Sequence, residues 1–303
     1  MKLRVLILGY GEMGHAMEYL LAARYDVRIW SLDGVKGRDS TLEDEVPWAQ
    51  VILFCLPVNP HHEVASRIAS YLAKGSVCLS IAKGLDETGR TAAQVFERVF
   101  GGKHHYGVVY GPMISEEIRM GRYAFADAVL SDAADFGVVH TLFRGSALVC
   151  QQATDMHGRS WSVILKNVYA IMFGVADELK LGDNMRGHLM VAAIAELSGI
   201  VQSFGGQAHT PYSYAGLGDL LTTATSAGSH HHALGQQLVR GEWSDISGEG
   251  VHTLRMVEKY HPFEWRTYPL FSLVRDIATA PETLNERVQD YLKLLRETES
   301  CAI

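Results

Sequence analysis

The sequence predicts an α/β fold, in which a doubly wound, mostly parallel sheet domain is followed by an all-α C-terminal domain. Three observations predict it. An apolar run at the N-terminus leads directly into the glycine-rich turn Gly9-Tyr10-Gly11-Glu12-Met13-Gly14. Short apolar runs then alternate with helical patterns through the first half of the chain, which is typical of a parallel sheet. From about Asp155 onward, the apolar residues recur at helical spacing instead.

The first half provides the strands and the helices between them. A helix from Glu12 to Ala23 is expected directly after the glycine turn. Because strands and helices alternate, the strands should form one mostly parallel sheet with helices on both faces, as in a Rossmann-like domain. The expected strands are Leu3–Gly9, Val27–Trp30, Val51–Leu56, Val77–Ile81, Val108–Tyr110 and Ala126–Leu130.

The second half is expected to be helical. Apolar residues recur at helical spacing from Trp161 to Val175, and a second such pattern runs from Asn184 to Phe204. No Pro- or Ser-rich linker marks the boundary between the halves, so its position rests on the change of period alone. We therefore predict a Rossmann domain at residues 1–154 and a helical domain at residues 155–303.

Composition excludes some classes of protein. The chain has 303 residues, of which 48% are hydrophobic and 20% charged, which is enough for two domains with cores of their own. A net charge of -7 without clustered Lys and Arg argues against nucleic-acid binding. No apolar stretch approaches the ~20 residues of a membrane span, and the N-terminus enters a strand pattern without a cleavage site, so we expect a cytoplasmic protein that does not bind membranes.

The glycine turn predicts dinucleotide binding. Gly9 allows a tight turn after the strand, Gly11 lets the backbone approach a pyrophosphate, and Gly14 lets the following helix pack on the strand. Free N–H groups at the start of that helix would hold the phosphates. Asp33 follows the second strand and would accept hydrogen bonds from the adenosine ribose, which favours NAD over NADP. NADP stays open, because Lys36 and Arg38 are near enough in sequence to meet a 2′-phosphate.

Two lysines are candidates for the chemistry. Lys83 ends an apolar run, so its ammonium should project from the carboxyl edge of the sheet, unless it is a solvated loop lysine. Lys166 lies in a helix that is apolar most of the way around, and lysines are seldom buried without a partner. Asp219 opens a later helix with Thr223 four residues on, and is the partner of Lys166, a helix N-cap, or both.

These segments together resemble the NAD(P)-dependent glycerol-3-phosphate dehydrogenase family, bacterial type, over nearly the whole chain. The ordered set is more specific than a glycine turn alone. Its members are Gly9 to Gly14, Leu79-Ser80-Ile81-Ala82-Lys83-Gly84-Leu85, Gly111-Pro112, Leu165-Lys166-Asn167-Val168, Leu181-Gly182-Asp183-Asn184, Gly205-Gly206, Gly216-Leu217-Gly218-Asp219-Leu220 and Glu249-Gly250.

The resemblance implies roles for these residues. Lys166 would exchange the proton of the substrate hydroxyl while hydride passes to or from the nicotinamide, and Lys83, Asp219 and Thr223 would complete the catalytic set. It also implies a small anionic substrate, a homodimer and a cleft between the domains. The implied substrate contacts are Lys83, Gly111, Met113, Asn167, Ser229, His230 and His231. The implied cofactor contacts are Gly9, Gly11, Glu12, Met13, Gly14, Asp33, Pro57, Lys83, Ser115 and Glu249.

The departures from the family pattern lie around the substrate. The chain reads Ser229-His230-His231 where the family typically has Ser-Arg-Asn, and Met113 where it typically has Ser. An arginine offers a permanent bidentate fork, so its loss should weaken phosphate recognition by about 2 to 4 kcal/mol unless another cation compensates. The histidine run, which continues to His232, is either a substitute anion site, a metal site or a polar loop. Metal is the least favoured, since adjacent histidines rarely converge on one ion.

Two other histidine pairs, His61-His62 and His104-His105, are expected on surface loops.

Three functions remain open at this point. The favoured one is a glycerol-3-phosphate dehydrogenase-like enzyme. The second is a dehydrogenase of another small hydroxy acid or polyol, of the 6-phosphogluconate type. The third is a non-catalytic NAD-binding homologue. The adjacency of Lys166 and Asn167 argues against the second, and the joint presence of the lysines with Asp219 and Thr223 argues against the third.

Overall fold

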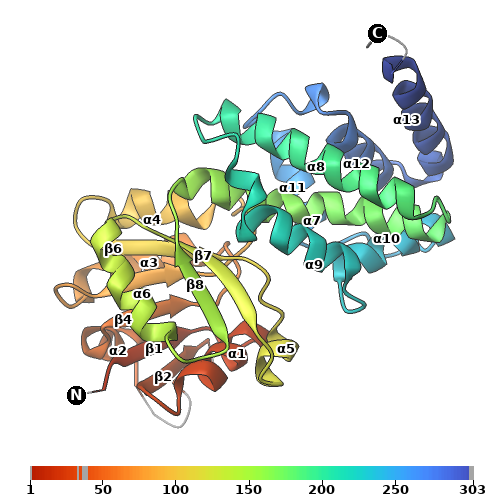
Figure 1. The fold of residues 1–303 in the computed structure, drawn as a ribbon. Helices are drawn as coiled ribbons and strands as arrows, with labels where there is room; N and C mark the ends of the chain where they lie inside the picture. Colours follow the sequence, from red (N-terminus) through yellow and green to blue (C-terminus); the bar gives the residue numbers. More distant parts are fainter. Residues whose placement is uncertain (1, 33, 36–39, 300–303) are drawn as a thin grey trace. The chain divides into compact units, whose positions relative to one another are not determined.

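The structure is a computed structural model that describes residues 2–32, 34–35 and 40–299 (Figure 1). The chain divides into two compact units. One comprises Met1–Ser160 with Ser213–Ala215, and the other comprises Trp161–Tyr212 with Gly216–Ile303. The first holds the sheet and the second is helical. The predicted fold class, a Rossmann-like sheet domain followed by a helical one, is confirmed.

The sheet has eight strands in the order β3-β2-β1-β4-β5-β6-β7-β8. All six predicted strands are present, whereas β3 and β8 were not predicted. The strands are β1 (Arg4–Leu8), β2 (Asp26–Ser31), β3 (Gly34–Val35), β4 (Val51–Phe54), β5 (Val77–Ser80), β6 (His105–Tyr110), β7 (Ala124–Leu130) and β8 (Leu148–Gln152).

Strand direction decides which loops share an edge. β2, β1, β4, β5 and β6 are parallel neighbours, so the carboxyl ends of β1, β4, β5 and β6 lie at one edge of the sheet. β7 is antiparallel to β6 and β8 is parallel to β7, so these two strands end at the opposite edge. The glycine turn, Pro57, Lys83 and Gly111 all follow strands of the first group.

Helices cover both faces of the sheet, because side chains of a strand alternate between its faces. In β1, Val5 and Ile7 pack into one core cluster with α1, α5 and α6, while Leu6 and Leu8 pack into another with α2, α3 and α4. This is the doubly wound arrangement. The helices are α1 (Glu12–Leu21), α2 (Leu42–Glu45), α3 (His61–Ile68), α4 (Ala92–Phe100), α5 (Ser115–Arg119) and α6 (Phe136–Phe143).

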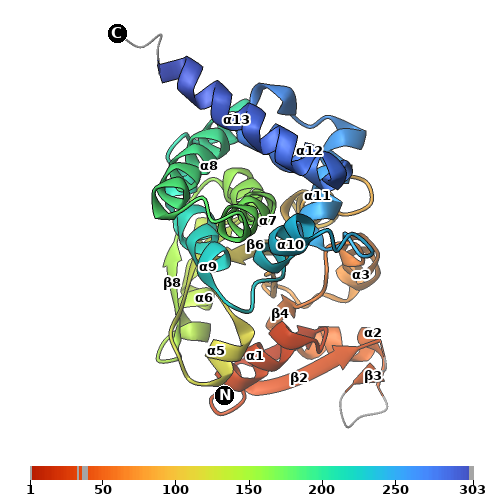
Figure 2. The ribbon, with the colours of Figure 1, turned by 90° about the vertical axis from the view of Figure 1, so that its right-hand side faces the viewer.

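The helical unit is built around α7, which runs through its middle (Figures 1 and 2). Every residue of α7 from Trp161 to Ala176 is buried, as the apolar pattern predicted. Each helix in the described part of the chain is too short or too polar to cross a bilayer. The helices are α7 (Met156–Glu178), α8 (Asp183–Ser203), α9 (Asp219–Thr225), α10 (His230–Arg240), α11 (Glu249–Tyr260), α12 (Pro269–Thr279) and α13 (Leu284–Glu299).

α7 and α10 cross at two glycines. A Cβ on Gly174 of α7 would lie 1.9 Å from the carbonyl oxygen of His232, and a Cβ on Gly235 of α10 would lie 2.0 Å from that of Ile171. These separations are far below van der Waals contact, so the two helix backbones approach as closely as glycine alone permits.

Candidate active site

The glycine turn has a distinct steric environment at each glycine. Gly9 has a φ of +94°, and a Cβ there would lie 2.6 Å from the carbonyl oxygen of Cys55. A Cβ on Gly14 would lie 2.3 Å from the carbonyl oxygen of Gly9, so close packing of α1 on β1 requires glycine. A Cβ on Gly11 would meet nothing within 4 Å. The space beside Gly11 is therefore open, which suits a ligand that must approach the backbone.

Two predicted cofactor residues meet at the start of α1. The Ser115 hydroxyl donates to the Glu12 carbonyl oxygen at 2.7 Å, and the Arg119 guanidinium contacts the Glu12 carboxylate at 2.7 Å. Met13 is half-buried and packs against the core of the sheet domain. Asp33, predicted to contact the ribose, lies outside the described residues.

Lys83 and Gly111 are brought together at the carboxyl edge of the sheet. The half-buried Lys83 ammonium donates to the Gly111 carbonyl oxygen at 2.8 Å, which joins the ends of β5 and β6. Pro57, just after β4, is exposed. Met113 is only 6% exposed and packs into the core of the sheet domain, so its thioether fills a hydrophobic cluster.

The prediction that His61 lies in a surface loop is wrong. Its side chain is fully buried at the start of α3, with its two ring nitrogens 2.8 Å from the Pro57 carbonyl oxygen and 2.9 Å from the Ser80 hydroxyl. Burial lowers the pKa of His61 to about 4. Its neighbour His62 is exposed. His105 also departs from the prediction, since it begins β6 and pairs with Asp135 at 2.8 Å.

The helical unit assembles the predicted proton-transfer group. The Lys166 ammonium lies 3.2 Å from the Asp219 carboxylate and donates to the Thr223 hydroxyl at 2.5 Å. Thr223 in turn donates its own hydrogen to the Asp219 carbonyl oxygen at 2.7 Å, so its hydroxyl oxygen is free to accept from the lysine. Lys166 is 5% exposed and Asp219 is 3% exposed. The ammonium is therefore held by a charge and a dipole away from bulk water.

A π-helical turn, Tyr214–Gly218, leads into Asp219. Within it, a Cβ on Gly216 would lie 2.1 Å from the carbonyl oxygen of Pro211, so the turn folds tightly on the preceding chain. Gly218 is the N-cap residue of α9, and Asp219 is its first helical residue. The predicted ion pair with Lys166 is present. π-helical turns are often found at functional sites.

Two further predicted residues surround Lys166. The Asn167 side-chain amide is 3.4 Å from the Glu249 carboxylate, which links α7 to α11. The His231 Nε2 accepts a hydrogen bond from the Gly250 backbone N–H at 3.2 Å. Burial lowers the pKa of His231 to about 3, and the nearby charges of Lys166 and His230 add to this effect. The His231 ring is therefore neutral at physiological pH, with its proton on Nδ1.

The chain is similar to known proteins over most of its length. Residues 37–133 and 155–289 match the family domains described as the N-terminus and the C-terminus of NAD-dependent glycerol-3-phosphate dehydrogenase. A glycerol-3-phosphate dehydrogenase [NAD(P)+] of Gloeobacter violaceus is 31% identical over 85% of this chain and 86% of its own. One of Trichormus variabilis is 33% identical over 84% of each chain. The chain belongs to the NAD-dependent glycerol-3-phosphate dehydrogenase family.

A solved structure of this family shares the fold. The glycerol-3-phosphate dehydrogenase of Coxiella burnetii superposes with a TM-score of 0.82 at 24% identity, covering 96% of this chain and 99% of the other. A ketopantoate reductase from Ralstonia eutropha superposes with a lower TM-score of 0.56. The sheet-then-helices architecture is thus that of glycerol-3-phosphate dehydrogenases.

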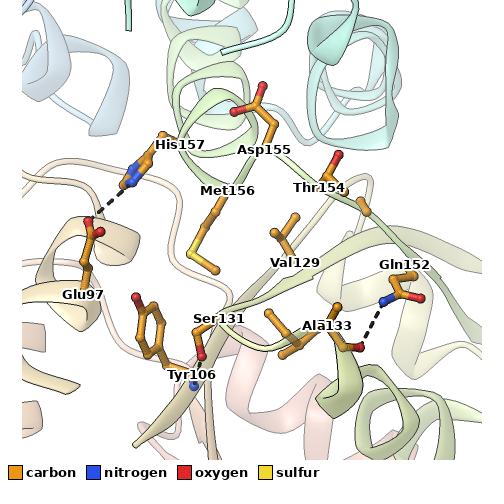
Figure 3. Close-up of a pocket in the computed structure, with 12 residues that line it drawn as sticks. Glu97, Tyr106, Val129, Ser131, Ala133, Gln152, Thr154, Asp155, Met156 and His157 are labelled. Atoms are coloured by element: carbon orange, nitrogen blue, oxygen red, sulfur yellow. Dashed lines mark hydrogen bonds and ion pairs between the residues drawn. The ribbon is translucent and has the colours of Figure 1, made fainter. Parts of the chain in front are cut away.

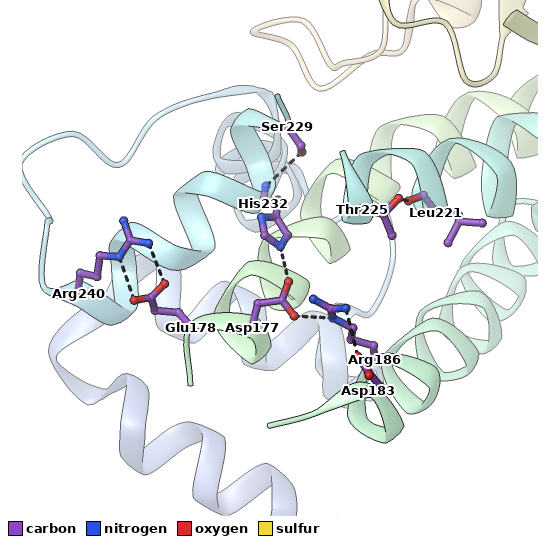
Figure 4. A network of polar contacts seen from close by, with 9 residues as sticks. All are labelled: Asp177, Glu178, Asp183, Arg186, Leu221, Thr225, Ser229, His232 and Arg240. Carbon is purple, nitrogen blue, oxygen red and sulfur yellow. Dashed lines mark hydrogen bonds and ion pairs between the residues drawn. The ribbon is translucent and has the colours of Figure 1, made fainter. Parts of the chain in front are cut away.

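The three histidines of the run that departs from the family pattern lie in different environments. His230 is exposed, and His231 is the partly buried neutral acceptor. The His232 ring lies 2.7 Å from the Asp177 carboxylate, which also accepts from Arg186 at 2.6 Å (Figure 4). Ser229 accepts from the His232 backbone N–H at 3.3 Å and so caps α10. His230 is the member of the run whose ring faces solvent.

Among the described residues, no group of three or more His, Cys, Asp or Glu side chains is placed to bind a metal ion. A separate cavity of about 610 Å³ lies in the sheet domain, where β7 and β8 end (Figure 3). Glu97 and His157 form an ion pair of 3.4 Å on its wall, above Tyr106 and Met156. It contains none of the predicted site residues and lies at the sheet edge opposite the glycine turn.

Proposed function

We propose that the protein is an NAD-dependent oxidoreductase that interconverts sn-glycerol 3-phosphate and dihydroxyacetone phosphate, or a closely related small hydroxy and keto pair. The observation that carries the proposal is the buried Lys166 ammonium held by Asp219 and Thr223. A buried lysine of this kind can serve as a general acid and base. Two relatives of the chain are named glycerol-3-phosphate dehydrogenase [NAD(P)+], after the reaction proposed here.

The glycine turn fits a dinucleotide. The space beside Gly11 admits a pyrophosphate, and the start of α1 offers backbone N–H groups. The residues that would hold the cofactor are Gly9 to Gly14, Pro57, Lys83, Ser115 and Glu249, with Asp33 selecting NAD; NADP is the alternative. The nicotinamide, when bound, takes or supplies the hydride.

Lys166 then handles the proton. In the reducing direction its ammonium gives a proton to the substrate carbonyl oxygen, and in the oxidising direction the neutral amine takes the proton of the hydroxyl. Asp219 and Thr223 lie within hydrogen-bonding distance of the lysine nitrogen and would hold it in place for the transfer. Positioning of this kind removes much of the entropic barrier to reaction.

The substrate side is assigned to Lys83, Gly111, Asn167 and the segment from Ser229 to His231, without Met113, because the Met113 thioether is buried in the core of the sheet domain. We infer a small anionic substrate whose tail meets His230, the exposed member of the run. Residues 1–154 would act as the NAD-binding domain and residues 155–303 as the substrate and catalytic domain.

We also propose a cytoplasmic homodimer. Large apolar side chains of the helical unit are exposed at Val191, Tyr212 and Leu221, with 72%, 64% and 52% of their surfaces accessible. A second subunit packed on the helical unit would cover side chains of this kind. Light scattering of the purified protein should give twice the chain mass of 33.4 kDa, and a monomer at micromolar concentration would contradict the dimer.

One assay tests the activity. The absorbance of NADH and of NADPH should fall when dihydroxyacetone phosphate is added, and faster with NADH. Unphosphorylated, sulfonated and phosphonate analogues of the substrate follow in the same assay, with Lys166→Met as the inactive control. Turnover of a hydroxy acid instead would indicate the 6-phosphogluconate type, and NADH binding without turnover of any compound would indicate a non-catalytic homologue.

A further inference from the structure

We propose that His61 is a positioning residue that ties together the backbone at the ends of β4 and β5, where the cofactor binds. His61 does not touch the reacting atoms. It acts through Pro57, which follows β4, and through Ser80 and Ala82, which precede Lys83. The inference rests on the proposed NAD-dependent function and assigns to this chain a residue that sets the shape of the cofactor site.

The hydrogen bonds form a chain whose direction is determined. The Pro57 carbonyl oxygen can only accept, so His61 Nδ1 carries the ring proton and donates to it at 2.8 Å. Nε2 of the neutral ring is then an acceptor, so the Ser80 hydroxyl donates to it at 2.9 Å, while Ser80 Oγ accepts from the Ala82 backbone N–H at 3.2 Å. The hydrogen bonds therefore run without a break from the Ala82 backbone N–H, just after β5, to the Pro57 backbone carbonyl, just after β4.

The series of hydrogen bonds through His61 requires a neutral imidazole ring. His61 is fully buried and packs against the aromatic rings of Phe54 and Phe96, at ring-centroid distances of 5.1 and 5.6 Å. A charged ring would carry hydrogen on both nitrogens, and Nε2 would lose its ability to accept from Ser80. Burial lowers the pKa of His61 to about 4, so the neutral form is the one present at physiological pH.

The two loops that His61 joins lie at the ligand-binding edge of the sheet. β1, β4, β5 and β6 are parallel neighbours in that order, and ligands of such sheets bind beyond the carboxyl ends of the strands. Lys83 directly follows Ala82, and its ammonium bonds to Gly111 after β6. His61 therefore joins the end of β4 to that of β5, and Lys83 extends the connection to β6.

Substitutions at His61 and Ser80 separate positioning from packing. His61→Leu fills the apolar space but makes neither hydrogen bond. His61→Asn places an amide near Nδ1 and keeps the bond to Pro57, while His61→Gln reaches Ser80. Ser80→Ala removes the hydroxyl that links His61 to the Ala82 backbone and leaves His61 itself unchanged. His62→Ala changes the exposed neighbour in the same helix and serves as the matched control.

The readouts are the dissociation constant of NADH by fluorescence titration, KM and kcat, and the melting temperature. We expect about a tenfold weaker NADH affinity for His61→Leu, about threefold to fivefold for Ser80→Ala, and intermediate losses for His61→Asn and His61→Gln. KM for NADH should rise with the dissociation constant, kcat should change less than threefold, and His62→Ala should match the wild type.

The outcomes are distinguishable. If His61→Leu binds NADH like the wild type, His61 is structural and the inference is wrong, whatever the melting temperature does. If His61→Leu fails to fold, Ser80→Ala decides: unchanged affinity overturns the inference. A wild-type protein that binds neither NADH nor NADPH would overturn the proposed function and this inference together, whereas tight wild-type binding with unaffected variants overturns the inference alone.

Discussion

Lys166 and Asp219, fifty-three positions apart in sequence, form a buried ion pair in which the lysine nitrogen is 3.2 Å from the carboxylate. The same nitrogen donates to Thr223, one turn further along α9. An ammonium group with two partners and little solvent has a defined position but can still give up its proton. This relationship yields the first two predictions.

Lys166→Met should lower kcat by about 10²- to 10⁴-fold, because the group that transfers the proton is lost. Lys166→Arg should be nearly as inactive, since a guanidinium keeps the charge but does not release a proton at neutral pH. NADH affinity should stay within about threefold of the wild type in both variants. Steady-state kinetics and fluorescence titration check these values, and a Lys166→Met variant with more than a tenth of wild-type kcat would exclude Lys166 as the acid-base group.

Asp219→Ala should destabilise the protein by about 3 to 5 kcal/mol, because it leaves a buried ammonium without its counter-ion. Asp219→Asn keeps the shape and one oxygen acceptor, so the loss should be smaller. Thr223→Val removes the hydrogen bond accepted from Lys166 and the one donated to the Asp219 carbonyl oxygen, and should cost about 1 to 3 kcal/mol. Urea unfolding measures all three, and an Asp219→Ala variant as stable as the wild type would mean that the lysine is not charged in the folded state.

Much of this arrangement could be predicted from the sequence, and the reasons are local. The helix around Lys166 has apolar residues on nearly all sides, and a lysine there implies a buried partner. The glycine turn follows a strand and precedes a helix, which is the context that gives such a motif its meaning. The family resemblance then indicated that the segment around Asp219 pairs with Lys166.

Other features left no local signal. β3 has two residues, and β8, Leu148–Gln152, is half exposed with no clear alternation of polar and apolar residues. His61 follows Asn59-Pro60 and precedes a second histidine, which is typical of a surface turn. Its burial depends on Ser80 and on aromatic residues distant in sequence, so only the folded sheet places it.

The glycine turn offers a contrast between two neighbouring substitutions. Gly11→Ala adds a methyl group to open space, so the free energy of unfolding should change by less than about 1 kcal/mol. NADH affinity should fall at least about tenfold, because the methyl group would keep the pyrophosphate from coming close to the backbone. Gly14→Ala should lose both stability and NADH affinity, since its Cβ would lie 2.3 Å from the Gly9 carbonyl oxygen. Thermal melts and NADH titrations separate the two. Equal melting temperatures for both variants would contradict the packing role of Gly14.

Stability should depend on pH through His231. Its pKa is about 3 in the folded protein against an ordinary 6.5, so between these values the unfolded chain binds a proton that the folded one does not. Stability from this residue is present above pH 6.5 and is lost as the pH falls, by on the order of 2 kcal/mol between pH 7 and pH 5. His231→Asn should therefore show a smaller drop in unfolding free energy over that range than the wild type. An identical drop would show that the ring is already charged or exposed.

His230→Arg should improve the use of dihydroxyacetone phosphate, because it places a permanent bidentate cation at an exposed position of α10. We expect KM for that substrate to fall by about tenfold, with NADH affinity unchanged. His232→Asn should not affect substrate recognition in the same way, since the His232 ring is hydrogen-bonded to the Asp177 carboxylate. No improvement, or a loss of activity, would mean that this chain recognises a different substrate tail.

The glycine crossing of α7 and α10 has a mechanical consequence. Since the backbones of the two helices touch at Gly174 and Gly235, any larger side chain at either position would push α10 away from α7. Lys166 lies on α7 and His230 lies on α10, so the two glycines set how far apart the backbones that carry these side chains lie.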